Sequence, residues 1–568
     1  MTLSADTPTT TTGGSALAAS LAAHGIDRIF CVPGESFLGL LDALESQARI
    51  EVVTTRHEGG AGFMALADAR LTGRAGVAMV SRGPGCANAT IAVQTANEDS
   101  VPFVLLVGQV ERRNLGRGAF QEVDYGRTFS ALAKAVIEIT DPDRATELLA
   151  QAFHIAERGL PGPVVVTLPE DMLDSPCAAQ PAPVFGLGRP AVAEAGVARV
   201  AADLMAADRP VLLVGSALRS AEGRRALRRV ADLWQMPVVV SSRQSDLLDN
   251  AHAAYAGQLA YGADPRLVEG YKATDLMLAV GTRLGDVTSQ GYSFPAAPVP
   301  QIPLHHVHMA PEAIGALRVC ASALLSDCAG FLDRLADLAP EATRWGGWRD
   351  RLHADWLSWS DWSRAGLPDE AQDGVVFGAV IAELARQLPR DAIVTSDAGN
   401  FGAWLGRFLR LGAGQSLLGP MSGAMGYGLP AAIAASLRHP ERRAVCVVGD
   451  GGMMMTGAEL ATACAAGAAP IVIVSDNGAY GTIRMHQERR HPGQSFATSL
   501  GRPDFAALAQ SMGAMAHSVR RPEEIAPALA AAFADGTQPS LIHVRTSLQH
   551  ISPLLTLSSG SALLEAAQ

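Results

Sequence analysis

Lysine is nearly absent from this chain. Only Lys134 and Lys272 are lysines among its 45 lysine and arginine residues. The sequence therefore contains no GK[ST] phosphate-binding loop and few side chains that could form a Schiff base. Its seven cysteines are scattered and form no CxxC pair, so we expect reduced thiols and a cytoplasmic location.

Long apolar runs and basic blocks are also missing. No stretch of about 18 apolar residues occurs, so we expect no membrane span. The formal net charge is -11, and without a basic block neither nucleic acid nor an anionic membrane is an expected partner. The 568 residues are 48% hydrophobic and 18% charged, which is typical of a globular protein with three or four domains.

Short apolar runs that end in glycine alternate with Ala- and Leu-rich segments of helical length. This pattern predicts an α/β fold with three doubly wound parallel-sheet domains, because strands buried on both faces lack polar alternation. A Trp-rich linker is expected before the last domain, since it holds five of the seven tryptophans. The expected order is a disordered tail over 1–12, then domains over 13–180 and 191–339, the linker over 340–372, a domain over 373–550, and a tail or lid over 551–568.

The first and last predicted domains resemble each other. Three strand-to-glycine junctions recur in the same order and at a nearly constant offset, which indicates one shared topology. In such sheets ligands bind beyond the carboxyl ends of the strands, so these junctions are the expected functional sites. The paired segments begin at Ile29 and Ile393, at Gly76 and Arg443, and at Phe103 and Ile471.

Polar residues end two strands of the last domain. Asp450 lies in a Gly-Asp-Gly-Gly turn, and Asn477 follows 27 residues later at the end of the next strand. One strand–helix–strand crossover would bring both side chains to the same sheet edge. Glycine backbone amides can approach an anion, and carboxylate and amide oxygens suit Mg²⁺. We therefore predict a site for magnesium and a diphosphate.

These segments resemble the thiamin-diphosphate motif, in which GDG is followed some 27 residues later by NN. Here the first Asn is replaced by Asp476 and the second is kept as Asn477. The resemblance implies that Asp450, Asn477 and the carbonyl of Ala479 hold Mg²⁺. Further segments, TTRHEGGAGFMA, GPGCAN, GAFQE and GAMGYGLPAA, make nearly the whole chain similar to acetolactate synthases.

The resemblance also implies roles for individual residues. Glu58 would pair with the coenzyme's pyrimidine, Met425 would wedge the coenzyme into a bent form, and Gln121 would line its thiazolium. Phe120 and His486 would contact the substrate. Further coenzyme contacts are expected from Asn88, Gly399, Asn400, Phe401, Gly423, Gly449, Gly451, Gly452, Tyr480 and Gly481.

The implied reaction is decarboxylation of a 2-oxo acid and transfer of the acyl-anion equivalent to a second carbonyl compound. In this family the pyrimidine and the diphosphate are bound by different subunits, so a homodimer at minimum, and a homotetramer, are expected. The alternatives are a decarboxylase that releases an aldehyde and a non-catalytic coenzyme-binding protein.

Two departures bear on the substrate. His486 stands where acetolactate synthases carry a Trp that selects the second keto acid, and Glu35 follows the PG turn, where they have PGGA. Glu35 would place a second carboxyl near the reacting atoms, where it would act as an acid or base or favour a cationic or neutral partner. Alternatively, it would complement a helix N-terminus. FAD binding stays open, and GSALRS in place of GxGxxG in the middle domain favours a flavin-free chain.

Overall fold

The computed structural model describes residues 11–557 and contains three six-stranded parallel sheets. The predicted α/β class with three parallel-sheet domains is therefore confirmed. The described chain divides into two compact units at Gly188 and Arg189, and the short segment Ala461–Ala466 groups with the first unit. The expected tail over residues 1–10 and the expected tail or lid over 558–568 lie outside the described residues.

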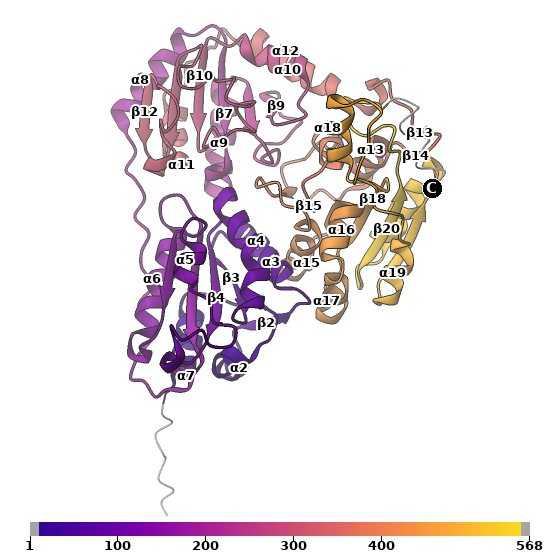
Figure 1. Cartoon of the computed structure of the whole chain (residues 1–568). Helices are drawn as coiled ribbons and strands as arrows, with labels where there is room; N and C mark the ends of the chain where they lie inside the picture. The colour runs from indigo at the N-terminus through magenta and orange to yellow at the C-terminus, as the bar shows by residue number, and fades with distance from the viewer. Residues whose placement is uncertain (1–10, 558–568) are drawn as a thin grey trace, which may run out of the picture. The chain divides into compact units, whose positions relative to one another are not determined.

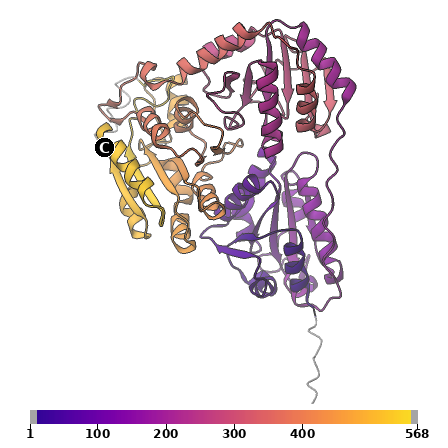
Figure 2. The same cartoon turned by 180° about the vertical axis from the view of Figure 1, so that it is seen from behind.

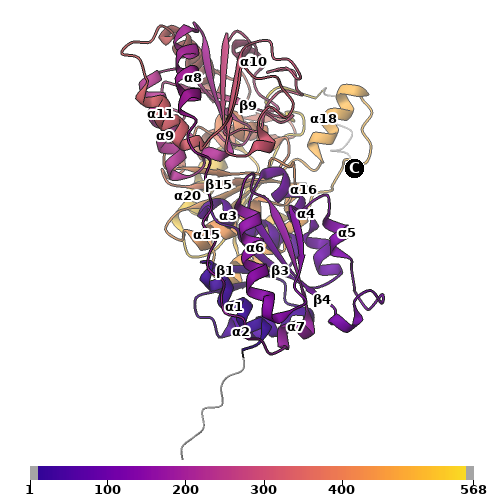
Figure 3. The ribbon, with the colours of Figure 1, turned by 90° about the vertical axis from the view of Figure 1, so that its left-hand side faces the viewer.

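The first unit is built on a sheet whose strand order is β2-β1-β3-β4-β6-β5. Buried Val, Leu and Met side chains fill β3 and β4, as expected of strands covered on both faces. Helices α3 and α4 pack together, while α1 packs against α2, α6 and α7 (Figures 1 and 3). The strands are β1 (Arg28–Cys31), β2 (Glu51–Thr54), β3 (Gly76–Val80), β4 (Phe103–Gln109), β5 (Ala135–Glu138) and β6 (Pro163–Pro169), and the helices are α1 (Gly13–Ala23), α2 (Leu38–Glu45), α3 (Glu58–Thr72), α4 (Pro84–Asp99), α5 (Tyr125–Phe129), α6 (Ala145–Glu157) and α7 (Glu170–Asp174).

The last sheet has the same topology as the first, with strand order β16-β15-β17-β18-β20-β19. The predicted likeness of the two domains is thus confirmed. Helix α13 packs against α14 and α20, and α15 packs against β15 and β17. Figure 2 shows this last domain from behind, in orange to yellow. The strands are β15 (Ile393–Ser396), β16 (Ser416–Leu418), β17 (Ala444–Gly449), β18 (Ile471–Asp476), β19 (Met515–Val519) and β20 (Ser540–Arg545), and the helices are α13 (Phe377–Gln387), α14 (Phe401–Phe408), α15 (Gly428–Arg438), α16 (Asp450–Thr456), α17 (Glu459–Ala466), α18 (Gly481–Arg490), α19 (Phe505–Ser511) and α20 (Ile525–Ala534).

The middle sheet runs β12-β11-β10-β7-β8-β9, which is a doubly wound order that reverses between β7 and β10. A small antiparallel hairpin, β13 (Glu370–Ala371) with β14 (Gly374–Val375), follows it. The strands are β7 (Pro210–Val214), β8 (Val238–Ser241), β9 (Tyr255–Leu259), β10 (Leu276–Val280), β11 (Leu304–His308) and β12 (Ser322–Leu325), and the helices are α8 (Glu194–Ala206), α9 (Ala221–Trp234), α10 (Pro265–Lys272), α11 (Cys328–Asp337) and α12 (Gly346–Trp359).

The tryptophans cluster on and beside α12. Trp345, Trp348, Trp356 and Trp359 are buried in the core of the middle sheet, and the indole of Trp348 donates to the carbonyl of Pro210 at 3.1 Å. Trp362 instead is partly buried and packs edge-on against Phe408, at the border of the core of the last sheet. These apolar contacts fix α12 to the middle sheet, whereas Trp362 packs against the last sheet.

Candidate active site

A cavity of about 270 Å³ lies at the carboxyl ends of β15, β17 and β18. Backbone pairing of β17 with β18 brings Gly449 opposite Ser475, so the turns that follow these two strands meet at one edge. All of the residues of the last domain that the sequence predicts to bind the coenzyme line this cavity. They are Gly399, Asn400, Phe401, Gly423, Met425, Gly449, Asp450, Gly451, Gly452, Asn477, Ala479, Tyr480 and Gly481.

Asp450 is buried at the start of α16, directly after β17. Its carboxylate accepts hydrogen bonds from the backbone amides of Gly451 and Gly478, each at 2.8 Å. Burial and, to a smaller extent, the nearby Asp476 carboxylate together raise the pKa of Asp450 to about 7, although the backbone donors lower it. A cation bound to this carboxylate would stabilise its ionised form against both burial and the repulsion from Asp476.

The turn after β18 presents the other predicted metal ligands. The side-chain oxygen of Asn477 accepts the amide hydrogen of Ala479 at 3.0 Å, which folds the turn tightly. Among the described residues, no group of three or more His, Cys, Asp or Glu side chains is placed to hold a metal. A metal here would instead use one carboxylate, one amide oxygen, one backbone carbonyl and ligand oxygens, a hard donor set that fits Mg²⁺.

Two glycines next to Asp450 pack closely against neighbouring side chains. A Cβ atom on Gly451 would lie 2.7 Å from the Tyr480 ring, and one on Gly452 would lie 2.1 Å from an Asp397 oxygen. Any larger residue would displace these neighbours, so the Gly-Asp-Gly-Gly turn is dictated by close packing.

Asp397 is a site residue that the sequence did not single out. Its buried carboxylate accepts the amide hydrogens of Gly426, at 2.6 Å, and of Gly428. It therefore fixes the loop that carries Met425 to the end of β15. Burial raises the pKa of Asp397 to about 6, although these amides and Arg243 lower it. The only local signal was an Asp directly after a buried strand.

Asp476, the departure from the family's first Asn, has charged partners. Its carboxylate is fully buried and accepts hydrogen bonds from His543, at 2.7 Å, and from Arg545. Both partners lie on β20, the strand that pairs with β18. The extra carboxylate is thus paired and hydrogen-bonded, as a buried charge must be.

The segment after β20 also reaches this cavity, where Thr546, Ser547, His550 and Ile551 line the wall. Asp373 anchors the segment by accepting hydrogen bonds from the Ser547 hydroxyl at 2.6 Å and from the amides of Leu548 and Gln549 at 2.8 and 2.9 Å. These lining residues were also missed, because their anchor lies far away in the sequence.

In the first unit, Glu58 opens helix α3 at the end of β2 and is half-buried. The Asn88 side-chain amide donates to its carboxylate at 2.9 Å. A Cβ atom on Gly85 would lie 3.2 Å from the same carboxyl, so the start of α4 packs closely against it. The structure therefore brings Glu58 and Asn88 together.

Gln121 lies in a loop of strained backbone, with φ of 63°. A Cβ atom on Gly83 would lie 2.9 Å from the Gln121 carbonyl oxygen, so this loop packs closely against the turn that leads from β3 into α4. The Glu122 carboxylate accepts the backbone amide hydrogens of Gly116 and Ala119, which hold its pKa below the usual range. Phe120, in the same loop, is 79% exposed.

Glu35 is exposed in the turn that follows β1. The next residue, Ser36, is buried, and its hydroxyl lies 3.0 Å from that of Ser81 and accepts the Arg82 amide hydrogen at 3.2 Å. Because Ser81 follows β3, which pairs with β1, Glu35 stands at the same sheet edge as the turn before α4.

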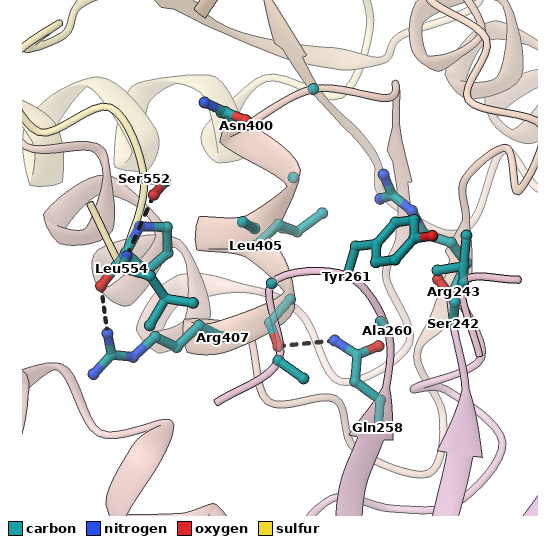
Figure 4. A pocket seen from close by; sticks show the side chains of 18 of the residues that line it. Ser242, Arg243, Gln258, Ala260, Tyr261, Asn400, Leu405, Arg407, Ser552 and Leu554 are labelled. Carbon is teal, nitrogen blue, oxygen red and sulfur yellow. Dashed lines mark hydrogen bonds between the residues drawn. The ribbon is translucent and has the colours of Figure 1, made fainter. Parts of the chain in front are cut away.

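A second cavity of about 560 Å³ adjoins the first, and Ala398, Gly399, Asn400, Gly423 and Thr482 line both. Figure 4 shows labelled residues of its wall, with Asn400, Leu405 and Arg407 coming from α14 or its start. Arg407 donates to the carbonyl of Pro553 at 3.0 Å, which holds residues 552–554 in the wall of the cavity. The predicted substrate residue His486 lines this second cavity.

Two backbone amides at the switch point of the middle sheet are hydrogen-bonded within the sheet's own turns. The amides of Gly215 and Ala217 donate to the carbonyls of Val280 and Gly281 at 3.0 and 3.1 Å, so the turns after β7 and β10 are bonded to each other. A dinucleotide diphosphate normally approaches backbone amides of such a turn. In this chain the amides of Gly215 and Ala217 already donate to backbone carbonyls, so they are not free to bind a diphosphate.

Comparison with known proteins gives three family matches in chain order. Residues 11–127 match the N-terminal TPP binding domain of thiamine pyrophosphate enzymes, residues 197–335 match their central domain, and residues 397–544 match their C-terminal TPP binding domain. No helix that the structure describes is long and apolar enough to cross a membrane.

Three relatives illustrate the similarity. An acetolactate synthase large subunit of Parasynechococcus marenigrum is 33% identical over 96% of this chain and 89% of its own length. One of Corynebacterium glutamicum is 30% identical over 94% and 87%. The large subunit of acetolactate synthase isozyme 3 of Escherichia coli is 29% identical over 96% and 97%.

Proposed function

Because the chain belongs to the thiamin-diphosphate-dependent enzymes and is acetolactate synthase-like, we propose that it decarboxylates a 2-oxo acid and transfers the acyl-anion equivalent to a second carbonyl compound. The observation that carries the proposal is the convergence of Asp450, Asn477 and Ala479 on one cavity with the glycine turn. That donor set supports magnesium and a diphosphate as its occupants.

When bound, thiamin diphosphate supplies the electron sink that makes loss of carbon dioxide feasible. The chain's own residues would hold and activate it. We assign Asp450 and Asn477 to the metal, Met425 to the support of the coenzyme, and Glu58 to the proton that its pyrimidine ring shares. Asn88 donates to Glu58 and so fixes the orientation of that carboxyl.

The assembly and location belong to the same proposal. In the family, the pyrimidine and the diphosphate of one coenzyme are bound by different subunits. Glu58 would therefore come from one copy of this chain and Asp450 from another, so we propose a homodimer at minimum and a homotetramer. The seven cysteines are free thiols, which supports a reducing compartment such as the cytoplasm. We propose no nucleic-acid or membrane partner.

A flavin-free enzyme is part of the proposal, because the amides of Gly215 and Ala217 are engaged by neighbouring carbonyls. Purified protein should release no flavin on denaturation. A yellow preparation whose supernatant absorbs near 450 nm after denaturation would show that FAD is bound.

Glu35 favours one alternative, a decarboxylase that releases an aldehyde, since an exposed carboxyl at this sheet edge could deliver a proton. A non-catalytic coenzyme-binding protein is the remaining alternative. The test is a screen of 2-oxo acids for carbon dioxide release with thiamin diphosphate and magnesium, in the presence and absence of an aldehyde. Ligated products support the proposal, free aldehyde alone supports the decarboxylase, and no release above that of Asp450→Asn supports binding without catalysis.

A further inference from the structure

Helix α18 turns one face toward the larger cavity. Thr482, Met485, His486 and Arg489 line this cavity, and their spacing of three, four and seven residues places them along one side of the helix. The helix is fastened to the coenzyme side, because Thr482 donates to Asn400 at 3.0 Å and Asn400 contacts the Met485 sulfur at 3.6 Å.

The opposite side of α18 is fixed to the protein core. Arg484 is 1% exposed and donates to the Thr498 hydroxyl at 2.8 Å. The orientation of the helix is therefore set from both sides, and His486 and Arg489 reach the cavity as a consequence of that anchoring.

The charges that line this cavity are mostly basic. Asp264 is the one acidic side chain among its described lining residues, and it is paired with Arg266 at 3.0 Å. Two of the basic groups are committed to backbone carbonyls: Arg407 to Trp359 and Pro553, and Arg243 to Asp397.

His486 and Arg489 differ from these groups. Both are exposed, and within residues 11–557 neither forms an ion pair or a side-chain hydrogen bond. The cavity wall next to the coenzyme site thus holds two uncommitted basic side chains one helical turn apart.

The size of the cavity points to a ligand larger than a three-carbon acid. Its volume is about 560 Å³, within the range of about 300–1,000 Å³ that pockets for larger small molecules occupy. Because it shares Gly399, Asn400 and Thr482 with the coenzyme-side cavity, a molecule in it would lie next to the reacting atoms.

We propose that the second carbonyl substrate carries an anionic group away from its carbonyl, and that Arg489 and His486 bind this anion. The inference rests on the proposed function, whose acceptor substrate it specifies. A carboxylate and a phosphate share the required chemistry, since both accept charge-assisted hydrogen bonds from a guanidinium. His486 and Arg489 are specificity-determining residues in this account.

The test compares acceptors of matched carbon skeleton in the ligation assay. Butanal is set against 4-oxobutanoate for the carboxylate, and glyceraldehyde against its 3-phosphate for the phosphate. We expect kcat/KM for one or both anionic acceptors to exceed that of the neutral partner by about tenfold or more. The arm with the larger ratio identifies the anion.

Variants assign the preference to the helix face. Arg489→Gln should lower kcat/KM for the anionic acceptor about tenfold or more and change the neutral acceptor less than about threefold. Arg489→Lys should recover part of the loss. Arg490→Gln is the matched control, because Arg490 is exposed on α18 but does not line the cavity. Equal losses with both acceptors, or equal kcat/KM for wild type with both, would overturn the inference.

A binding measurement keeps the inference separate from the proposed function. The coenzyme-loaded chain is titrated calorimetrically with each acceptor in the absence of a 2-oxo acid. Wild type and Arg490→Gln should bind the anionic acceptor more tightly than Arg489→Gln does. If ligation fails but this difference is present, the proposed function is wrong and the anion site stands. If ligation occurs and the difference is absent, the anion site is wrong.

Discussion

Asp450 and Asp476 accept hydrogen bonds from the same backbone amide, that of Gly478, at 2.8 and 3.1 Å. Two carboxylates that share one N–H group lie close together, and Asp476 accordingly raises the pKa of Asp450. Asp476 is compensated by His543 and Arg545, whereas the hydrogen bonds that Asp450 accepts come from the backbone amides of Gly451 and Gly478. This asymmetry supports the proposal that Asp476 has a structural role and that Asp450 binds the metal.

Glu58→Gln should separate coenzyme binding from turnover. The amide keeps the size of the carboxyl but cannot share a proton with the pyrimidine, so carbon dioxide release should fall at least about 100-fold. Coenzyme affinity, measured by calorimetry, should change less than about threefold. Glu45→Gln, at an exposed position of α2, is the control and should leave both unchanged. A Glu58→Gln enzyme with wild-type turnover would remove Glu58 from its assigned role.

Glu122→Ala should loosen the loop that carries Gln121. The variant loses the acceptor for the amides of Gly116 and Ala119, in a segment that already contains left-handed backbone at Gly116 and Gln121. Trypsin should therefore cut after the exposed Arg117 several times faster than in wild type. Cleavage after the exposed Arg364, which is followed by Ala365, serves as the internal reference. Equal rates after Arg117 would mean that Glu122 does not hold the loop.

Asp397→Asn should gain stability relative to wild type as pH rises. Burial raises the pKa of Asp397 to about 6, above its value of about 4 in an unfolded chain. Stabilisation from the protonated carboxyl is then complete below about pH 4 and is lost as pH rises to about 6.

Asparagine does not titrate, and its loss of one amide hydrogen bond is the same at every pH. The difference in thermal midpoint should move toward the variant by about 2–5 °C between pH 4.5 and 7. A difference that stays constant, or moves toward wild type, would contradict the burial of a titrating carboxyl there.

Asp373→Ala should release the segment that lines the coenzyme-side cavity. Three donors lose their acceptor, which should cost about 1–3 kcal/mol locally. Amide hydrogen exchange of Ser547–Ile551 should accelerate by about tenfold or more, and coenzyme should dissociate faster. Glu370→Ala, in the same hairpin and exposed, is the control. Unchanged exchange would show that the segment is held by its apolar contacts alone.

The parts of the fold that could be predicted are those that depend on local pattern. The buried strands β3, β4, β15 and β18 begin where the paired segments were predicted to begin, because continuous apolar runs that end at glycine mark such strands. The half-exposed edge strands β5 and β19 were not predicted, since an edge strand lacks that continuous run.

The same distinction holds for the site. Asp450 and Asn477 could be predicted because neighbouring parallel strands must end at one edge. The roles of Asp397 and Asp373 could not, because their partners are backbone amides about 30 and 175 residues away in the sequence. The wall formed by Thr482, Met485 and Arg489 emerges only when α18 is placed against Asn400.

The most direct test is calorimetric titration of the intact chain with thiamin diphosphate at saturating magnesium. We predict saturable uptake approaching one coenzyme per chain, abolished by a chelator and weakened at least about tenfold in Asp450→Asn, since a neutral amide binds the metal less strongly. A magnesium-anchored coenzyme at the ends of β17 and β18 would be contradicted if the wild-type chain showed no measurable uptake. It would also be contradicted if neither the chelator nor the substitution changed the uptake.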